Sequence, residues 1–120
     1  MKIISFSWTT PALLAGAKTC TRRKWNPRYA RQFQKGELVA AFDRSPRYKG
    51  KRVATIRLTE VPYLENTSKM PEADFVAEGL AWMEKHDTVI QGFFADEFWD
   101  TWKDSGEDVY VVRFELVEVL

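Results

Sequence analysis

Hydrophobic and polar residues alternate in several short segments of the chain, and this pattern predicts strands. The run at residues 38–42 is continuously apolar, as expected for a strand buried in a sheet, whereas the last segment alternates over twelve residues. Residues 43–49 are rich in turn formers and predict a hairpin connection. Five segments are expected to be strands: residues 2–7, 19–23, 38–42, 51–61 and 108–119.

Apolar residues recur at helical spacing between these strands, and capping residues bound the segments. Thr10-Pro11 and Asn26-Pro27 each combine a capping side chain with a proline at the first helical position. Glycines at positions 16, 36 and 79 are expected to end helices. Short helices are therefore predicted at residues 11–15, 27–34, 71–78 and 95–103.

The last of these segments carries an aromatic stripe. Phe94, Phe98 and Trp102 are spaced at i, i+4 and i+8, with Trp99 beside them. Such a stripe most often packs into a core, so we interpret it as buried rather than as a cofactor contact.

The strands are too few and the helices too short for a doubly wound parallel sheet. We therefore predict the α+β class: a small mixed β-barrel with short flanking helices. The 120 residues suffice for one domain, residues 1–120, and 45% of them are hydrophobic, enough for a core without metal or disulfide support.

Charge is distributed very unevenly along the chain. Residues 1–57 contain fourteen Lys or Arg and two acids, whereas residues 58–120 contain four Lys or Arg and fifteen acids. The overall charge of +1 conceals this difference. One interpretation is a basic surface for nucleic acid or another phosphate-bearing partner. The other is mutual neutralisation of the two halves within one folded domain.

Several classes of function are disfavoured by the composition. Cys20 is the only cysteine and His86 the only histidine, so we expect no disulfide, no metal site and no cofactor. No apolar run approaches the length that spans a bilayer, and the N-terminus does not resemble a signal peptide. We expect a cytoplasmic protein with no membrane partner, and the sequence leaves its oligomeric state open.

Candidate chemistry is concentrated in residues 16–23, which place an amine, two hydroxyls and two guanidiniums directly after a glycine. A site for an anionic or amide-bearing ligand can use all of these groups. Positions i and i+3 of a strand face opposite ways, so Lys18 and Thr21 can converge only if Lys18 precedes the strand. Cys20 is interpreted as a small buried hydrophobic residue.

The pattern Leu13-Leu14-Ala15-Gly16-x-Lys18-Thr19-x-Thr21-x-Arg23 resembles the signature of the ASCH domain family. Further segments resemble that family in the same order along almost the whole chain: residues 36–39, residues 77–79 and residues 109–114. The resemblance implies a PUA-like barrel with a cleft that binds RNA or a nucleoside.

Some small bacterial members of that family are amidohydrolases that deacetylate acetylcytidine. The resemblance then implies that Lys18, Thr21 and Glu78 are catalytic. The candidate ligand or RNA contacts in this region are Gly16, Thr19, Arg22 and Arg23. Trp8 and Trp25, which flank the segment, are candidates to stack on a base, with core packing favoured for at least one of them. The chain departs from those enzymes in the helix expected after Pro27 and the aromatic helix around Trp99, for which the sequence predicts no role.

Two alternatives stay open at this point. The first is a binding module without turnover, in which Lys18, Arg22 and Arg23 contact phosphate. The second is a ribonuclease that uses the same basic cleft. Each residue also has an ordinary structural interpretation: Lys18 can cover the end of the first helix, Thr21 can be a plain strand threonine and Glu78 a surface residue.

Overall fold

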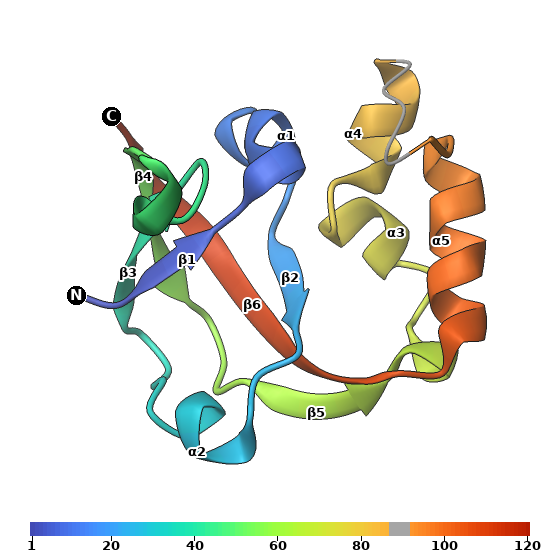
Figure 1. Cartoon of the computed structure of the whole chain (residues 1–120), viewed down its shortest axis with the longest axis horizontal. Coiled ribbons are helices and arrows are strands. Elements are labelled where there is room, and N and C mark those ends of the chain that lie inside the picture. Colours follow the sequence, from blue (N-terminus) through green and yellow to red (C-terminus); the bar gives the residue numbers. More distant parts are fainter. Residues whose placement is uncertain (87–91) are drawn as a thin grey trace.

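A computed structural model of the chain describes residues 1–86 and 92–120, and these residues form a mixed α+β structure (Figure 1). The strands are β1 (Ile3–Ser5), β2 (Cys20–Arg23), β3 (Leu38–Phe42), β4 (Arg52–Leu58), β5 (Tyr63–Asn66) and β6 (Asp108–Val119). The helices are α1 (Thr10–Leu14), α2 (Pro27–Ala30), α3 (Asp74–Ala77), α4 (Leu80–Lys85) and α5 (Ala95–Ser105). Three 3-10 turns supplement them: η1 (Ser7–Thr9), η2 (Pro46–Tyr48) and η3 (Thr67–Lys69).

The strands form one strongly curled sheet, a half-barrel, in the order β1-β3-β4-β6-β2. Strand β5 lies off this path and pairs with residues 108–111 at the start of β6. Only β1 and β3 are parallel, and the remaining described pairs are antiparallel. The long strand β6 joins the two sides of the curl because it pairs with β4, β2 and β5 in turn (Figure 1). β1 and β2 are the two ends of this order, and no ladder in the described residues joins them.

Two hydrophobic clusters fill the molecule. The first lies inside the curl, where alternate residues of the strands meet, and includes Ile4, Phe6, Val39, Ile56 and Phe114. The second joins α1 to the helices α4 and α5, and includes Ala12, Leu80, Met83 and Trp99. Because α1 contributes Leu13 to the first cluster and Ala12 to the second, this short helix is fixed by packing on both sides.

The alternation of apolar residues predicted the strands well. The bounds of β3 and β6 coincide with the expected segments, and β1, β2 and β4 lie within theirs. Strand β5 was not expected, because Tyr63 and Leu64 are exposed and the segment shows no buried face. The expected mixed α+β class is confirmed, but the expected barrel is only half formed, because the described sheet is curled and stays open between β1 and β2.

The capping residues give a mixed result. The side chain of Asn26 accepts a hydrogen bond from the backbone N–H of Tyr29 at 2.8 Å, as expected for a cap, although α2 ends at Ala30 and not near Gln34. The expectation that Thr10 caps the first helix was wrong, because η1 runs directly into α1. The helix expected at residues 71–78 is shorter than predicted, and α4 follows it after Gly79.

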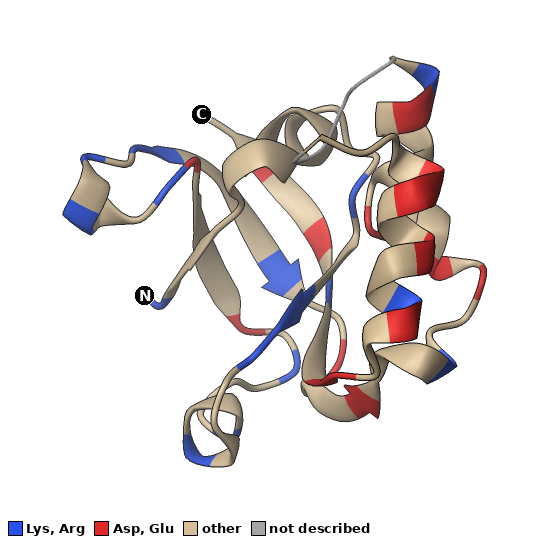
Figure 2. Cartoon of the chain, turned by 45° about the vertical axis from the view of Figure 1, so that its right-hand side comes forward, with Lys and Arg blue, Asp and Glu red and all other residues tan. Residues whose placement is uncertain are grey.

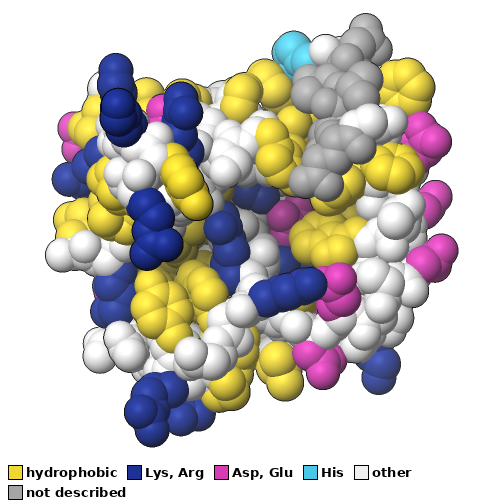
Figure 3. All heavy atoms as spheres, viewed as in Figure 1, with side chains coloured by type: hydrophobic (Ala, Val, Ile, Leu, Met, Phe, Trp, Pro, Cys, Tyr) yellow, Lys and Arg dark blue, Asp and Glu magenta, His cyan; other side chains and the backbone are white. Residues whose placement is uncertain are grey.

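The two charged halves of the sequence meet and form ion pairs across the domain. Lys18, Arg22, Lys24 and Arg57 from the basic half each contact a carboxylate of the acidic half. The remaining charges stay apart: the acids of α5 gather on one side (Figure 2), and Lys and Arg side chains occupy the opposite part of the face in Figure 3. Mutual neutralisation therefore accounts for the junction of the halves, and an acidic and a basic surface persist beyond it.

None of the helices in residues 1–86 and 92–120 is long and apolar enough to cross a membrane.

Gly79 is predicted to be intolerant of a side chain. Its φ angle of +88° lies in the left-handed region, and an added Cβ would stand 2.9 Å from the Cβ of Ala12 and 3.2 Å from that of Lys18. We expect Gly79→Ala to lower the free energy of unfolding by about 3 kcal/mol, from backbone strain plus overpacking.

Gly36→Ala is the matched control, because Gly36 has a similar φ of +84° but open space around it. It should cost only the strain, about 1 kcal/mol. Urea denaturation of both variants measures the difference, and equal losses would show that the contact with Ala12 is accommodated.

Candidate functional site

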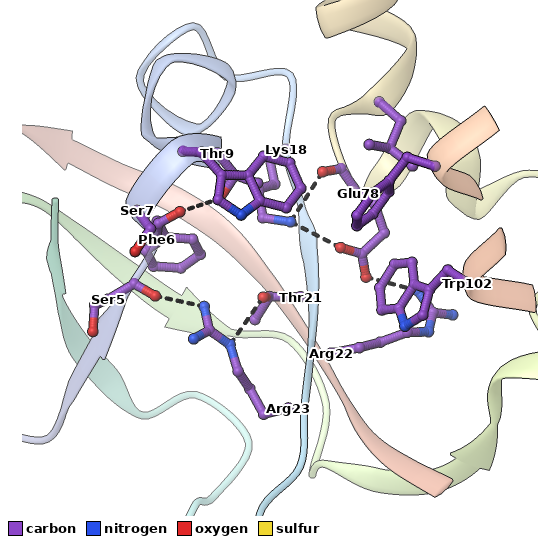
Figure 4. A pocket seen from close by; sticks show the side chains of 13 residues that line it. Ser5, Phe6, Ser7, Thr9, Lys18, Thr21, Arg22, Arg23, Glu78 and Trp102 are labelled. Carbon is purple, nitrogen blue, oxygen red and sulfur yellow. Dashed lines mark hydrogen bonds and ion pairs between the residues drawn. The ribbon is translucent and has the colours of Figure 1, made fainter. Parts of the chain in front are cut away.

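A cavity of about 300 Å³ lies at the open side of the half-barrel, between β1, β2 and the helices (Figure 4). Thirteen residues line it: Ser5, Phe6, Ser7, Trp8, Thr9, Lys18, Thr21, Arg22, Arg23, Glu78, Leu80, Phe98 and Trp102. The segment that the sequence singled out thus forms one wall, and residues distant in the sequence form the others.

Lys18 lies in the connection between α1 and β2, as the geometric argument from the sequence required. Gly16 turns the chain with a φ of +75°, and the backbone N–H of Thr19 then bonds the carbonyl of Ala77 at 2.8 Å. The Lys18 side chain is only 2% exposed. Its Nζ donates to the Glu78 carboxylate Oε1 and to the Glu78 backbone carbonyl, both at 2.9 Å.

Glu78 is the residue at the C-terminal end of α3, and the left-handed Gly79 that follows lets the chain turn away beneath it. Its carboxylate is shared between two cations: Oε1 accepts from Lys18, and Oε2 accepts from Arg22 Nη1 at 2.8 Å. Figure 4 shows the side chains of Lys18 and Glu78 pointing toward each other at the wall of the cavity. Glu78 is therefore a buried carboxylate with a fixed orientation, not a surface residue.

Arg22 is held entirely by carboxylates. Its side chain is 0% exposed, and it contacts Glu65 through Nε at 2.9 Å, Asp74 through Nη2 and Glu78 through Nη1. This arrangement corrects the expectation that Arg22 contacts a ligand phosphate, because all three of its nitrogens already have an acceptor. Arg22 instead positions Glu78.

Thr21 and Arg23 project from β2 on the same side, two residues apart. Arg23 Nε donates to Thr21 Oγ1 at 3.1 Å, and Arg23 Nη2 donates to the Ser5 carbonyl at 2.6 Å. The second bond links β2 to β1 across the open side of the sheet, where no backbone ladder does so (Figure 4). The guanidinium carbon also lies 5.5 Å from the centre of the Phe6 ring.

An aromatic wall faces these polar groups. Phe98 and Trp102 of α5 line the cavity together with Trp8, whose ring meets that of Phe98 edge-on at 5.3 Å. The aromatic stripe was expected to be core, and this was wrong for Phe94, which is 60% exposed. Phe98 and Trp102 are partly buried and pack against the second cluster, but they also border the cavity. Only Trp99, beside the stripe, is buried, because α5 packs against α4 through that neighbouring face.

Three other predicted contacts do not line the cavity. Gly16 and Thr19 are exposed at the entry to β2, where they shape the chain behind Lys18. Trp25 stacks on Phe33 at 4.5 Å and packs against the sheet core, so it is a structural residue. Of the two tryptophans proposed to stack on a base, Trp8 alone borders the cavity.

Sequence reasoning missed the residues behind the site. Asp74 accepts from Arg22 and also from both terminal nitrogens of Arg113, at 2.8 and 3.0 Å, while Glu65 holds the Nε of Arg22. One signal was present: Asp74 and Glu78 are four residues apart and so share a helical face. No sequence signal connected that face to Arg113 or to Glu65.

The ionisation of Asp74 reflects this environment. Burial alone would raise its pKa, but hydrogen bonds from Arg113 and Arg22 outweigh burial and hold the pKa below its usual value.

Burial raises the pKa of the Cys20 thiol to about 12, and the nearby Glu78 carboxylate adds to the effect. Cys20 is thus a buried thiol, as the sequence suggested, and not a nucleophile.

The site therefore combines a hydroxyl, an amine and a carboxylate on one cavity, with a rigid ionic layer behind them and an aromatic wall in front. Such a set can orient a planar ligand, hold a carbonyl oxygen by hydrogen bonds and move a proton between nitrogen and oxygen atoms.

Comparisons with known proteins give a fold and no family. No protein-family model and no curated protein sequence matches the chain. Among solved structures, the chain is similar to the crystal structure of protein EF3133 from Enterococcus faecalis V583, which is described with the family model DUF984. The TM-score is 0.63 with 17% sequence identity, and the match covers 99% of this chain and 81% of that one. At this identity the similarity establishes the α+β fold alone.

Asp74→Asn should destabilise the protein strongly at neutral pH. The substitution leaves two guanidiniums without their carboxylate, and breaking a buried pair in this way typically costs about 3–5 kcal/mol. Since the folded pKa of Asp74 is lowered, its stabilisation is complete above the unfolded pKa of about 4 and is lost as the pH falls through the folded pKa.

The difference in unfolding free energy between the wild type and Asp74→Asn should accordingly shrink below about pH 4. Urea denaturation at several pH values measures it, with Asp104→Asn on the exposed surface of α5 as control. A difference that is independent of pH would contradict the assignment.

Cys20 should resist modification in the folded protein. Because the thiol is buried and its pKa is about 12, we expect no reaction with Ellman's reagent at pH 8 until urea unfolds the chain. Rapid stoichiometric reaction of the native protein would show that β2 opens readily.

Proposed function

We propose that the cavity binds a nucleoside, and that the protein is an amidohydrolase that removes an acyl group from the exocyclic amine of a modified cytidine. One observation carries the proposal: Lys18 and Thr21 of one segment and Glu78, which lies 60 positions after Lys18, line a single cavity. The proposal also rests on the resemblance of residues 13–23 to the ASCH signature. The curled sheet fits the PUA-like fold that this resemblance implies.

The size and composition of the cavity support a nucleoside-sized ligand. Its volume of about 300 Å³ is at the lower end of small-molecule sites. Phe98, Trp102 and Trp8 offer ring surfaces against which a base can stack, a recurrent mode of recognising unpaired bases. The hydroxyls and charged groups of the opposite wall are available to the polar edge of the base.

In the proposed reaction, Thr21 Oγ1 attacks the amide carbonyl carbon and a C–O bond forms. Lys18 accepts the hydroxyl proton as it passes one of its own protons to Glu78 Oε1 along their 2.9 Å hydrogen bond. This path requires Thr21 Oγ1, which accepts from Arg23 in the structure, to approach Lys18 Nζ when the substrate binds. The Lys18–Glu78 pair then returns this proton to the exocyclic nitrogen as the C–N bond breaks, which releases cytidine. Water cleaves the acyl-threonine ester by the same proton path and yields a carboxylic acid.

Arg22 and Arg23 have supporting roles in this scheme. Arg22 holds Glu78 in the orientation that faces Lys18, and Arg23 holds the oxygen of Thr21. The hydrogen bond from Arg23 also stabilises negative charge on that oxygen as its proton leaves.

A binding module without turnover is the second candidate. The observation that favours it is that Lys18 and Glu78 are bonded to each other, an arrangement that also serves folding alone. The ionic saturation of Arg22 weakens the ribonuclease alternative, because it removes a cation from the surface that a phosphodiester would contact.

Lys18→Ala and Thr21→Ala are each expected to lower deacetylation of acetylcytidine by at least a hundredfold. The double variant should lose little more, because groups that act as a unit are non-additive. Thr21→Ser should keep measurable activity, since it retains the hydroxyl. Liquid chromatography of the released cytidine measures each rate.

Lys69→Ala and Thr59→Ala are matched controls at exposed positions away from the cavity and should retain full activity. If the wild-type protein binds cytidine but hydrolyses no acylated cytidine, the amidohydrolase proposal is excluded and the binding module remains. Full activity of Thr21→Ala would exclude the threonine nucleophile and favour direct attack by water.

A further inference from the structure

Arg23 differs from the other cations of the cavity in what it contacts. Lys18 pairs with Glu78, and Arg22 pairs with three carboxylates. Arg23 donates only to neutral oxygens, the Thr21 hydroxyl and the Ser5 carbonyl. Among residues 1–86 and 92–120, no carboxylate oxygen lies within ion-pair distance of its guanidinium.

Holding the charge of Arg23 without a carboxylate beside it carries an energetic cost. Burial lowers the pKa of Arg23, which reflects the unfavourable free energy of holding its charge away from water, and the more distant Glu78 offsets burial only in part. The face of the Phe6 ring compensates some of the charge as well. An anion that enters the cavity would complete the compensation and would gain a charge-assisted hydrogen bond.

We propose that the ligand of this cavity is a nucleoside monophosphate whose phosphate binds Arg23. The nucleoside part rests on the proposed function, whereas the anionic part rests on the unpaired guanidinium in the cavity wall. The hydroxyl of Ser7 also lines the cavity and can donate to a further phosphate oxygen. The base then lies toward Phe98 and Trp102 on the opposite side.

The surroundings favour one phosphate over a polynucleotide. Helix α5, which forms the aromatic wall, carries Asp96, Glu97, Asp100 and Asp104 against a single Lys103 (Figure 2). At physiological salt such charges act over about 8–10 Å, so a strand continuing past the aromatic wall would be repelled. The pairing of Arg22 and Lys18 also leaves Arg23 as the one described cation of the cavity wall without an acidic partner.

Isothermal titration calorimetry with cytidine, cytidine 5′-monophosphate and cytidine 3′-monophosphate tests the proposal. For the wild type, one of the monophosphates should bind at least tenfold more tightly than cytidine, and this ratio should fall as potassium chloride is raised. In Arg23→Gln the ratio, taken against cytidine in the same variant, should drop to about one. Arg28→Gln, which removes an exposed arginine of α2 outside the cavity, should behave as the wild type.

Arg23 also links two strands, so Arg23→Lys is included as a variant that keeps the charge. It should retain a ratio above one even if Arg23→Gln does not fold. Equal affinities of wild type for cytidine and both monophosphates overturn the proposal. So does an equal loss in Arg23→Gln and Arg28→Gln, or a cytidine-containing oligonucleotide that binds more tightly than either monophosphate.

Two small anions separate this inference from the proposed function. Inorganic phosphate should raise the melting temperature of the wild type and not of Arg23→Gln, whether or not any acylated cytidine is hydrolysed. If acetate stabilises the wild type as phosphate does, Arg23 holds the acid released by deacylation and the nucleotide proposal fails. If the monophosphate preference holds and hydrolysis is absent, the deacylase proposal fails and the anion site stands.

Discussion

The buried ion pairs between β2 and α3 are the constraint on which the rest of the molecule depends. Arg22, with a side chain fully out of solvent, is stable only because Glu65, Asp74 and Glu78 surround it. Transferring such a charge from water costs several kcal/mol, and each lost partner would leave that cost uncompensated. The sheet and the helical layer are therefore tied together at one point by charge, where elsewhere they are joined by hydrophobic packing.

This ionic layer explains the geometry of the cavity in front of it. Glu78 cannot rotate away, since Lys18 and Arg22 each hold one of its oxygens. Gly79 gives the chain the left-handed turn that brings α3 close to Lys18 and Ala12. The groups that face a ligand are thus placed by groups that do not, which is the arrangement expected of a preorganised site.

The open side of the half-barrel supplies the space. A closed sheet of this size would fill its interior with side chains. In the described sheet, β1 and β2 do not pair with each other, and the side chain of Arg23 bridges the gap between them. The same side chain that closes this gap faces the cavity and has no acidic partner among the residues that the structure describes. Arg23 therefore both bridges two strands and lines the cavity, and this makes it the most informative position for mutagenesis.

The sequence by itself determined five of the six described strands, the class of fold and the segment that bears the chemistry. Strands such as β3 and β6 follow from local periodicity, and Lys18 before β2 follows from the geometry of a strand after a glycine turn. These features depend on neighbouring residues only. The sequence also indicated Lys18, Thr21 and Glu78 together, through a resemblance and not through spacing. Their shared place on one cavity could not be read from the chain.

Only the tertiary structure decided which charges are paired and which face the cavity. Arg22 and Arg23 are adjacent and chemically alike, yet opposite faces of β2 send one into three carboxylates and the other to neutral oxygens. The aromatic residues of α5 divide similarly, with Trp99 in the core and Trp102 on the cavity. The physical reason is the same in both cases: burial and pairing are set by tertiary contacts between separate elements, such as that of Arg22 with Asp74, 52 positions away. Local sequence patterns carry no information about such contacts.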